Sequence, residues 1–173
     1  PGEVPPPIAE LHSKPAQAVA PLDPTVRIRD GARLPPSDAV IRNVGVVLDL
    51  HPGPLVIRGD RVQLQQVILN LLLNAMEAMT EDHGLDRTIV VKTEKAEVDA
   101  VHVAVQDAGS GLGPDASLQI FEPFYTTKPA GMGMGLSIAR SIVQSHGGLI
   151  WAANNPTRGA TFHIALPLNG GRA

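Results

Sequence analysis

Apolar residues follow a helical period in two segments of the chain. Between residues 60 and 80 they recur at i, i+3 and i+4, which predicts one long amphipathic helix that Asp60 can cap. The apolar face of this helix consists of Leu64, Val67, Ile68, Leu71, Leu72, Ala75 and Met79. A second helix is predicted for residues 136–145, because the pattern ends there in His146-Gly147-Gly148, a glycine cap.

Five other segments have the pattern of β-strands. Alternating apolar residues or runs of β-branched residues predict strands at 44–50, 89–93, 101–105, 149–153 and 161–166. Residues 55–57 are expected to be extended, and a short segment at 116–120 precedes the second helix. This order of elements predicts an α+β fold, a two-layer sandwich with helices on one face of a sheet.

Proline is concentrated at the start of the chain, where eleven of the 16 prolines lie within residues 1–54. Residues 1–24 lack an apolar period and are predicted to be a Pro-rich linker or remnant, which leaves residues 25–173 as the domain. The pattern of residues 25–43 is mixed, because Pro35 and Pro36 interrupt any helix there.

The composition argues against several classes of protein. The chain has 14 Lys and Arg against 17 Asp and Glu, a formal net charge of −3, which disfavours a broadly basic nucleic-acid binder. It has no Cys, which excludes disulfides and Cys-based metal sites and is compatible with a cytoplasmic location. It contains neither a long apolar run nor a signal-peptide pattern, so we expect this segment to make no membrane contact.

The long helix carries a polar stripe of unusual composition. Its members fall on one line beside the apolar face: Gln63, Gln66, Asn70, Asn74 and Glu77. Asn is a poor helix former, so two Asn one turn apart suggest a site, and amide oxygens suit a hard cation such as Mg²⁺. An ordinary solvated helix face is the alternative.

Two glycine-rich loops are the other candidates. Asp107 ends a strand and is followed by Gly109 and Gly111; its carboxylate could accept a hydrogen bond from an exocyclic amine, although an ordinary turn is equally compatible. Gly131, Gly133 and Gly135 directly precede the second helix, whose backbone N–H groups could bind an anion with Lys128 just upstream. Neither a dinucleotide-binding GxGxxG nor a P-loop is present.

Three of the five aromatic residues lie in the segment IFEPFYTTK, between the two glycine loops. We expect Phe121 and Phe124 to anchor this loop to the core.

Taken in order, these motifs resemble the ATP-binding catalytic domain of two-component sensor histidine kinases, a branch of the gyrase, heat-shock chaperone and mismatch-repair ATPases. QLQQVILNLLLNAMEAM is similar to the N box, DAGSGLG to the first glycine box and FEPFYTTK to the F box. GMGMGLSIARSIVQSHGG and GATFHIALP are similar to the remaining glycine boxes. The resemblance covers about residues 45–167 and implies a Bergerat-type fold with a mixed, mainly antiparallel sheet. FYTTK and NAMEAM are similar to the oxygen- and nitrogen-sensing subgroup.

The resemblance also implies roles for individual residues. Asn74 and Asn70 would hold Mg²⁺ and face the phosphates of ATP, with Glu77 at the edge of the site. Asp107 would bind the adenine amine with support from Thr161, while Gly109 and Gly111 make room for the base. The phosphates would be wrapped by a group consisting of Lys128, Gly131, Gly133, Gly135 and Leu136, and residues 114–134 would form a mobile lid.

The implied function is transfer of the ATP γ-phosphoryl group to a His on a separate dimerisation domain of the same parent, upstream of a response regulator. His12 lacks the acceptor motif of the family, so the acceptor is expected outside this chain. The alternatives are an ATP-hydrolysing conformational machine and a non-catalytic nucleotide-binding module. Asn70 favours the kinase, because hydrolytic relatives place a Glu there as general base and an amide cannot accept that proton.

Overall fold

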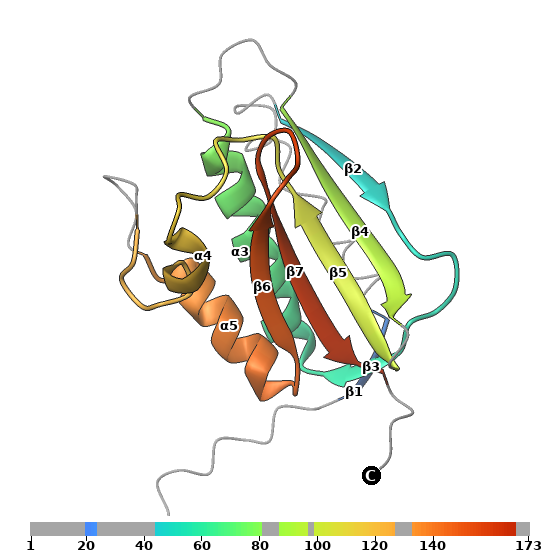
Figure 1. Ribbon diagram of the computed structural model, residues 1–173. Helices are drawn as coiled ribbons and strands as arrows, with labels where there is room; N and C mark the ends of the chain where they lie inside the picture. Colours follow the sequence, from blue (N-terminus) through green and yellow to red (C-terminus); the bar gives the residue numbers. More distant parts are fainter. Residues whose placement is uncertain (1–19, 24–43, 81–86, 97–98, 127–132, 169–173) are drawn as a thin grey trace, which may run out of the picture.

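A five-stranded mixed sheet forms one layer of the structure, and helices cover one of its faces (Figure 1). The computed structural model describes residues 20–23, 44–80, 87–96, 99–126 and 133–168. The two layers confirm the predicted α+β sandwich. Among the described residues, no helix combines the length and hydropathy needed to cross a membrane.

The strand order of the sheet is β2-β4-β5-β7-β6. The bounds of its strands in chain order are Gly45–Asp49 for β2, Thr88–Ala96 for β4, Ala100–Gln106 for β5, Leu149–Asn154 for β6 and Ala160–Pro167 for β7. β2 runs parallel to β4, and every other neighbouring pair is antiparallel. The sheet is therefore mixed and mainly antiparallel, as the resemblance implied.

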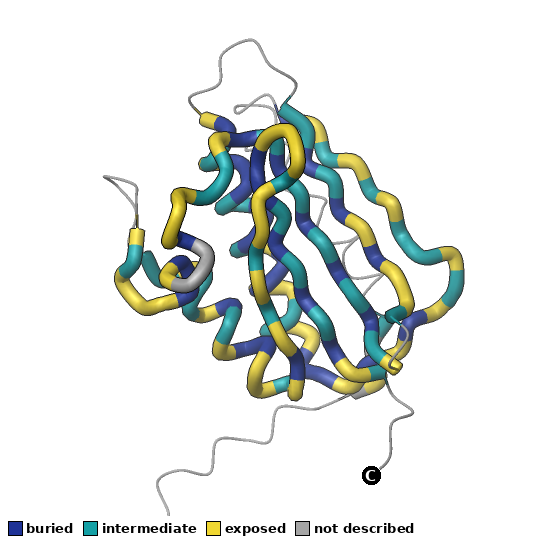
Figure 2. Tube along the Cα trace, in the orientation of Figure 1, coloured by how far each residue is buried: buried dark blue, intermediate teal, exposed yellow. Residues whose placement is uncertain are grey.

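Alternation along the strands separates the two faces of the sheet, which Figure 2 shows as a regular change of colour. Ile89, Val91 and Thr93 of β4 are buried, while Lys92 and Glu94 between and beside them are exposed. The same period buries the valines of β5 and buries Phe162 and Ile164 of β7. These side chains form the core beneath the helices.

The helix α3 spans Arg61–Ala78, close to its predicted range. Its cap is the predicted one: the Asp60 carboxylate accepts hydrogen bonds from the backbone N–H groups of Val62 (2.8 Å) and Gln63 (3.0 Å). Its buried residues include Val67, Ile68, Leu71, Leu72 and Ala75 of the predicted apolar face. Periodicity therefore identified both the helix and the face that it packs on the sheet.

The helix α5 spans Gly135–Ser145 and packs against α3, whereas α4 is a single short turn, Ala116–Gln119. The glycine cap is as predicted, since the N–H of Gly148 reaches the carbonyl of Val143 at 2.9 Å. His146 joins the two long helices, because its Nε2 accepts the backbone N–H of Asp60 at 3.0 Å. The end of α5 is thereby fixed to the start of α3.

A small second sheet forms where β1, Ala20–Leu22, pairs antiparallel with β3, Ile57–Gly59. β1 lies inside the segment 1–24 that its proline content marks as a linker. Residues 1–19 and 24–43 lie outside the described residues, and with them Pro35, Pro36 and His12. The boundary at residue 25 stays a prediction.

The expectation that two phenylalanines anchor the aromatic loop is right for Phe121 and wrong for Phe124. Phe121 is 6% exposed and packs edge-on against Phe162, with ring centroids 6.2 Å apart. Phe124 is 75% exposed and has a φ of 64°, in the left-handed region. Its N–H donates to the carbonyl of Gly133 at 2.9 Å, so the backbone of Phe124, rather than its ring, holds the loop here.

Candidate functional site

A cavity of about 550 Å³ opens between α3, the start of α5, the loop after β5 and the segment that follows α4. Four of the polar residues singled out in the sequence line it: Asn70, Asn74, Glu77 and Asp107. The structure thus brings part of the amide stripe and the strand-ending carboxylate into one site, although they are 30 or more residues apart in sequence.

The amide stripe divides into two parts. Asn70, Asn74 and Glu77 line the cavity, whereas Gln63 and Gln66, nearer the start of α3, are not among its lining residues. The Asn70 side-chain NH₂ donates to the carbonyl of Gly135 at 3.0 Å and joins α3 to the second glycine loop. This bond uses the amide nitrogen and directs the oxygen, the atom that a hard cation prefers, elsewhere. For these three residues the site interpretation is favoured over an ordinary polar face.

The carboxylate of Asp107 is buried, with 3% of the residue exposed, and is held by backbone groups. Its Oδ1 accepts the N–H of Gly109 at 2.9 Å and the N–H of Ala160 at 3.2 Å. The backbone N–H of Asp107 in turn donates to the carbonyl of Ala160 at 2.9 Å. A buried carboxylate on the wall of a cavity is suited to accept a hydrogen bond from an amine inside it.

The first glycine loop uses its glycines differently from the expectation. Gly111 and Gly113 line the cavity, but Gly109 does not. A Cβ at Gly109 would lie 2.5 Å from the carbonyl oxygen of Ala78, near the end of α3. Gly109 therefore permits the close approach of this loop to α3, and the expectation that it makes room for a base is not what the geometry shows.

The second glycine loop reaches the same cavity. Gly133, Gly135 and Leu136 line it where α5 begins, so the free N–H groups of the first turn of α5 lie beside the cavity. A helix N-terminus of this kind favours phosphate or another anion. Lys128 and Gly131, the other predicted members of this group, lie outside the described residues.

Thr161 does not face the cavity. Ala160 and Phe162 line it, and the two-residue period of β7 turns Thr161 to the opposite face of the sheet. The hydroxyl of Thr161 donates instead to the side-chain oxygen of Asn155. The residue that bonds to the Asp107 carboxylate is Ala160, so Thr161 does not support Asp107 from within the cavity as the resemblance implied.

Sequence reasoning missed two groups of residues. The first is the apolar wall of the cavity, which includes Leu73, Ile120, Tyr125, Met134 and Phe162. Their sequence pattern is that of the core, so no sequence signal separates wall residues from core residues. The second group lies in the turn between β6 and β7, where Asn155 and Arg158 bond to the backbone of the first glycine loop. The polar string NNPTRG marks that turn but not its partners.

The oxygen ligands that line the cavity suit Mg²⁺ bound together with phosphates, rather than a metal ion held by the protein alone. In the part of the chain that the structure describes, no three His, Cys, Asp or Glu side chains converge on a possible metal position. Asn70, Asn74 and Glu77 offer a few hard oxygen ligands, and Mg²⁺ typically takes one or two such ligands plus waters and substrate phosphates.

Comparison with known proteins agrees with this geometry. Residues 59–170 match the family model described as histidine kinase-, DNA gyrase B- and HSP90-like ATPase. The match covers more than half of the chain and includes α3, both described glycine loops and the strands β5 to β7. The chain belongs to this ATPase family.

Similar individual proteins are sensor histidine kinases. The sensor protein FixL of Bradyrhizobium diazoefficiens is 46% identical over 126 residues, which are 73% of this chain and 25% of FixL. The catalytic domain of the histidine kinase ThkA has a TM-score of 0.76 at 30% identity and covers 87% of this chain and 95% of that domain. The chain thus spans about a quarter of FixL and nearly all of an isolated kinase catalytic domain.

Two further structures show members of this group with bound molecules. Full-length ShkA, solved in complex with AMPPNP, has a TM-score of 0.77 at 26% identity over 90% of this chain and 32% of ShkA. ThkA in complex with the response regulator protein TrrA has a TM-score of 0.72 at 28% identity over 86% of this chain and 41% of ThkA.

Proposed function

We propose that this chain binds ATP with Mg²⁺ and positions the γ-phosphate for transfer to a His on a separate dimerisation domain of its parent protein. The observation that carries the proposal is the meeting of three features in one cavity: the buried Asp107 carboxylate, the glycine-lined start of α5, and the Asn70–Asn74 pair. They match the three parts of a Mg-nucleotide, namely the base, the phosphates and the metal. The AMPPNP complex of ShkA supports the same class of ligand.

Each residue then has a role in binding or orientation. Asp107 accepts a hydrogen bond from the adenine amine, and the first turn of α5, with Lys128 upstream, binds the phosphates. Asn74 and Asn70 present amide oxygens to Mg²⁺, and Glu77 lies at the edge of that position. Mg²⁺ held by these residues would neutralise phosphate charge, and phosphoryl transfer depends mainly on such charge stabilisation together with positioning.

The acceptor and the downstream partner lie outside this chain. We infer a dimerisation domain of the same parent as acceptor and a response regulator as receiver, since ThkA has been solved in complex with the response regulator TrrA. A net charge of −3 gives no support for a nucleic-acid partner. Because the proposed ligand is Mg-ATP, we infer a cytoplasmic location for this segment, whether the parent is membrane-anchored or free.

Asn70 argues against an ATP-hydrolysing machine. Its side chain is an amide whose NH₂ is bonded to the carbonyl of Gly135, so it cannot take a proton from an attacking water. Purified chain without an acceptor domain should therefore bind Mg-ATP by calorimetry and hydrolyse it slowly. Brisk hydrolysis that Asn70→Ala abolishes would favour the hydrolytic class, and absence of Mg-ATP binding would favour a non-catalytic module of the same superfamily.

A further inference from the structure

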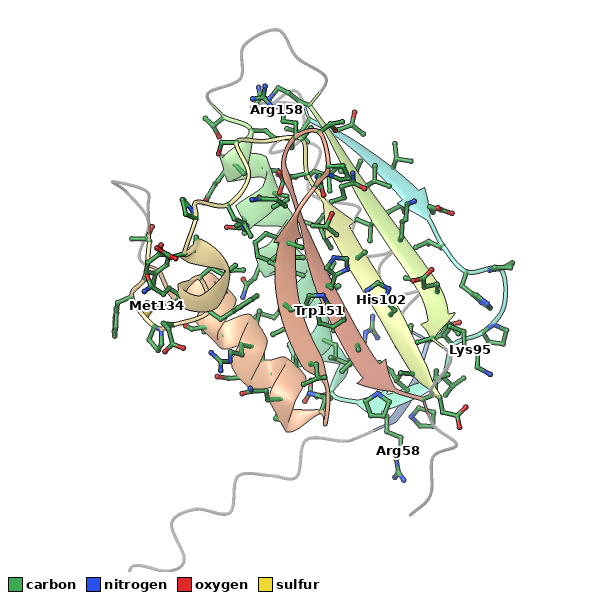
Figure 3. The ribbon with its side chains drawn as sticks, viewed as in Figure 1. Arg58, Lys95, His102, Met134, Trp151 and Arg158 are labelled. Atoms are coloured by element: carbon green, nitrogen blue, oxygen red, sulfur yellow. The ribbon has the colours of Figure 1, made fainter. Side chains whose placement is uncertain are left out.

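Two polar side chains, one at the end of β6 and one in the turn that follows it, bond to the first glycine loop. Arg158, labelled at the tip of this turn in Figure 3, donates from Nε to the carbonyls of Ala108 at 2.9 Å and Gly109 at 3.2 Å. Asn154 accepts the N–H of Leu112 at 2.7 Å and donates to its carbonyl at 3.1 Å. The end of β6 and the turn that follows it therefore hold the loop at two points.

Asn155 lies between these two contacts and uses both ends of its amide. Its Nδ2 donates to the carbonyl of Asp107 at 2.9 Å and to that of Arg158 at 2.8 Å. Its Oδ1 accepts the hydroxyl proton of Thr161. Because the hydroxyl donates to the oxygen end, it keeps the NH₂ end of Asn155 directed at the carbonyl of Asp107.

The backbone of the turn also packs against Asp107. Gly159 has a φ of 80°, and a Cβ there would overlap the Asp107 carbonyl oxygen. The next residue, Ala160, donates its N–H to the Asp107 carboxylate at 3.2 Å. The turn thus holds the carbonyl of Asp107, and the first residue of β7 holds its carboxylate.

We propose that Asn155, oriented by Thr161, is a positioning residue that fixes the Asp107 carboxylate and so sets the preference of the site for adenine over guanine. This inference rests on the proposed function, in which the cavity binds ATP. Asn155 is not among the lining residues of the cavity, so it acts through Asp107. Adenine presents an amine where guanine presents a carbonyl oxygen. A carboxylate fixed in position accepts a hydrogen bond from the amine and repels the carbonyl oxygen.

The test compares the affinities of the full chain for Mg-ATP, Mg-GTP and Mg-tripolyphosphate, which has no base, by calorimetry. Asn155→Ala and Thr161→Val should each weaken ATP binding roughly twofold to tenfold, the loss typical of one hydrogen bond. The affinities for GTP and tripolyphosphate should change little, so the ATP-to-GTP ratio falls. Thr161→Ser restores the hydroxyl and should restore the ratio.

Thr157→Ala is the matched control, because Thr157 lies in the same turn and is exposed. It should leave all three affinities unchanged. The proposal is overturned if the ATP-to-GTP ratio of folded Asn155→Ala or Thr161→Val equals that of the parent, or if all three ligands weaken together as general destabilisation would cause. If Asn155→Ala does not fold, the comparison of Thr161→Val with Thr161→Ser tests the proposal. A parent that binds tripolyphosphate but neither nucleotide, or none of the three, refutes the proposed function itself.

Discussion

At the scale of single residues, the site relies on a few polar side chains whose positions are fixed by hydrogen bonds. Asp107 is buried and held by two backbone N–H groups, and Asn70 is fixed to the second glycine loop. Preorganised polar groups of this kind lose little conformational entropy when the ligand binds, because their orientation is already set.

Asp107→Asn should weaken ATP binding about tenfold to a hundredfold. The substitution replaces a charged acceptor by an amide, and a hydrogen bond to a charged group is worth about 1.5–3 kcal/mol. Calorimetry with Mg-ATP and Mg-GTP measures the effect. Equal affinity of the parent for ATP and GTP would contradict the assignment of Asp107 to the adenine amine.

Gly109→Ala and Gly113→Ala form a matched pair that tests why each glycine is there. A Cβ at Gly109 would lie 2.5 Å from the carbonyl oxygen of Ala78, whereas a Cβ at Gly113 would meet nothing within 4 Å. Gly109→Ala should therefore lower the free energy of unfolding by about 1–3 kcal/mol, as overpacking does, and Gly113→Ala should change it little. Urea unfolding of both variants decides; equal stability would restore the view that Gly109 only makes room for the base.

At the scale of secondary-structure elements, α3 carries the metal-facing residues and is fixed at its first turn. The Asp60 carboxylate caps it, and His146 joins that turn to the end of α5. The two long helices that line the cavity are therefore fixed to one another where α3 begins, at the end of α3 remote from Asn74.

Asp60→Ala should lower the free energy of unfolding by about 1 kcal/mol, the typical contribution of an N-cap. Asp115→Ala is its control, because Asp115 precedes α4 but makes no side-chain cap bond. It should change stability by less than about 0.5 kcal/mol. Urea unfolding that gave the two variants the same loss would refute a stabilising role of the Asp60 cap.

The open face of the sheet carries a stacked group of rings, His102, Trp151 and His163 (His102 and Trp151 are labelled in Figure 3). Burial and the neighbouring His102 lower the pKa of His163 below its ordinary 6.5, and Glu94 opposes them. Below pH 6.5 the unfolded chain then binds more protons than the folded chain, so the stability that His163 contributes as a neutral ring is lost as the pH falls.

His163→Gln should reduce the loss of unfolding free energy between pH 7.5 and pH 5.5. Urea unfolding of parent and variant at both pH values isolates this contribution, and the single Trp, stacked 5.1 Å from His163, provides the fluorescence signal. An identical loss in the two proteins would show that His163 does not titrate abnormally.

At the scale of the whole molecule, sequence patterns were sufficient for the two layers and for four polar residues of the cavity wall, Asn70, Asn74, Glu77 and Asp107. The helical period predicted α3, and the order of motifs predicted the common site in which Asn70, Asn74 and Asp107 lie. Patterns were insufficient wherever the outcome depends on the direction in which a single side chain points. A shift of one position along β7 exchanges Ala160 for Thr161 at Asp107, and the backbone angle of Phe124 turns its ring outward. The neighbour of Gly109 is a tertiary contact, which no local pattern contains.

The central claim is that this domain transfers a phosphoryl group to a His on another domain. The most direct measurement mixes the chain with Mg-ATP labelled at the γ position and the dimerisation domain of the same parent, and then assays the acceptor for acid-labile phosphohistidine. The account predicts label on the acceptor, lost when its His is replaced and reduced with Asp107→Asn. Release of labelled inorganic phosphate at the same rate with and without the acceptor, and no labelled His, would contradict it.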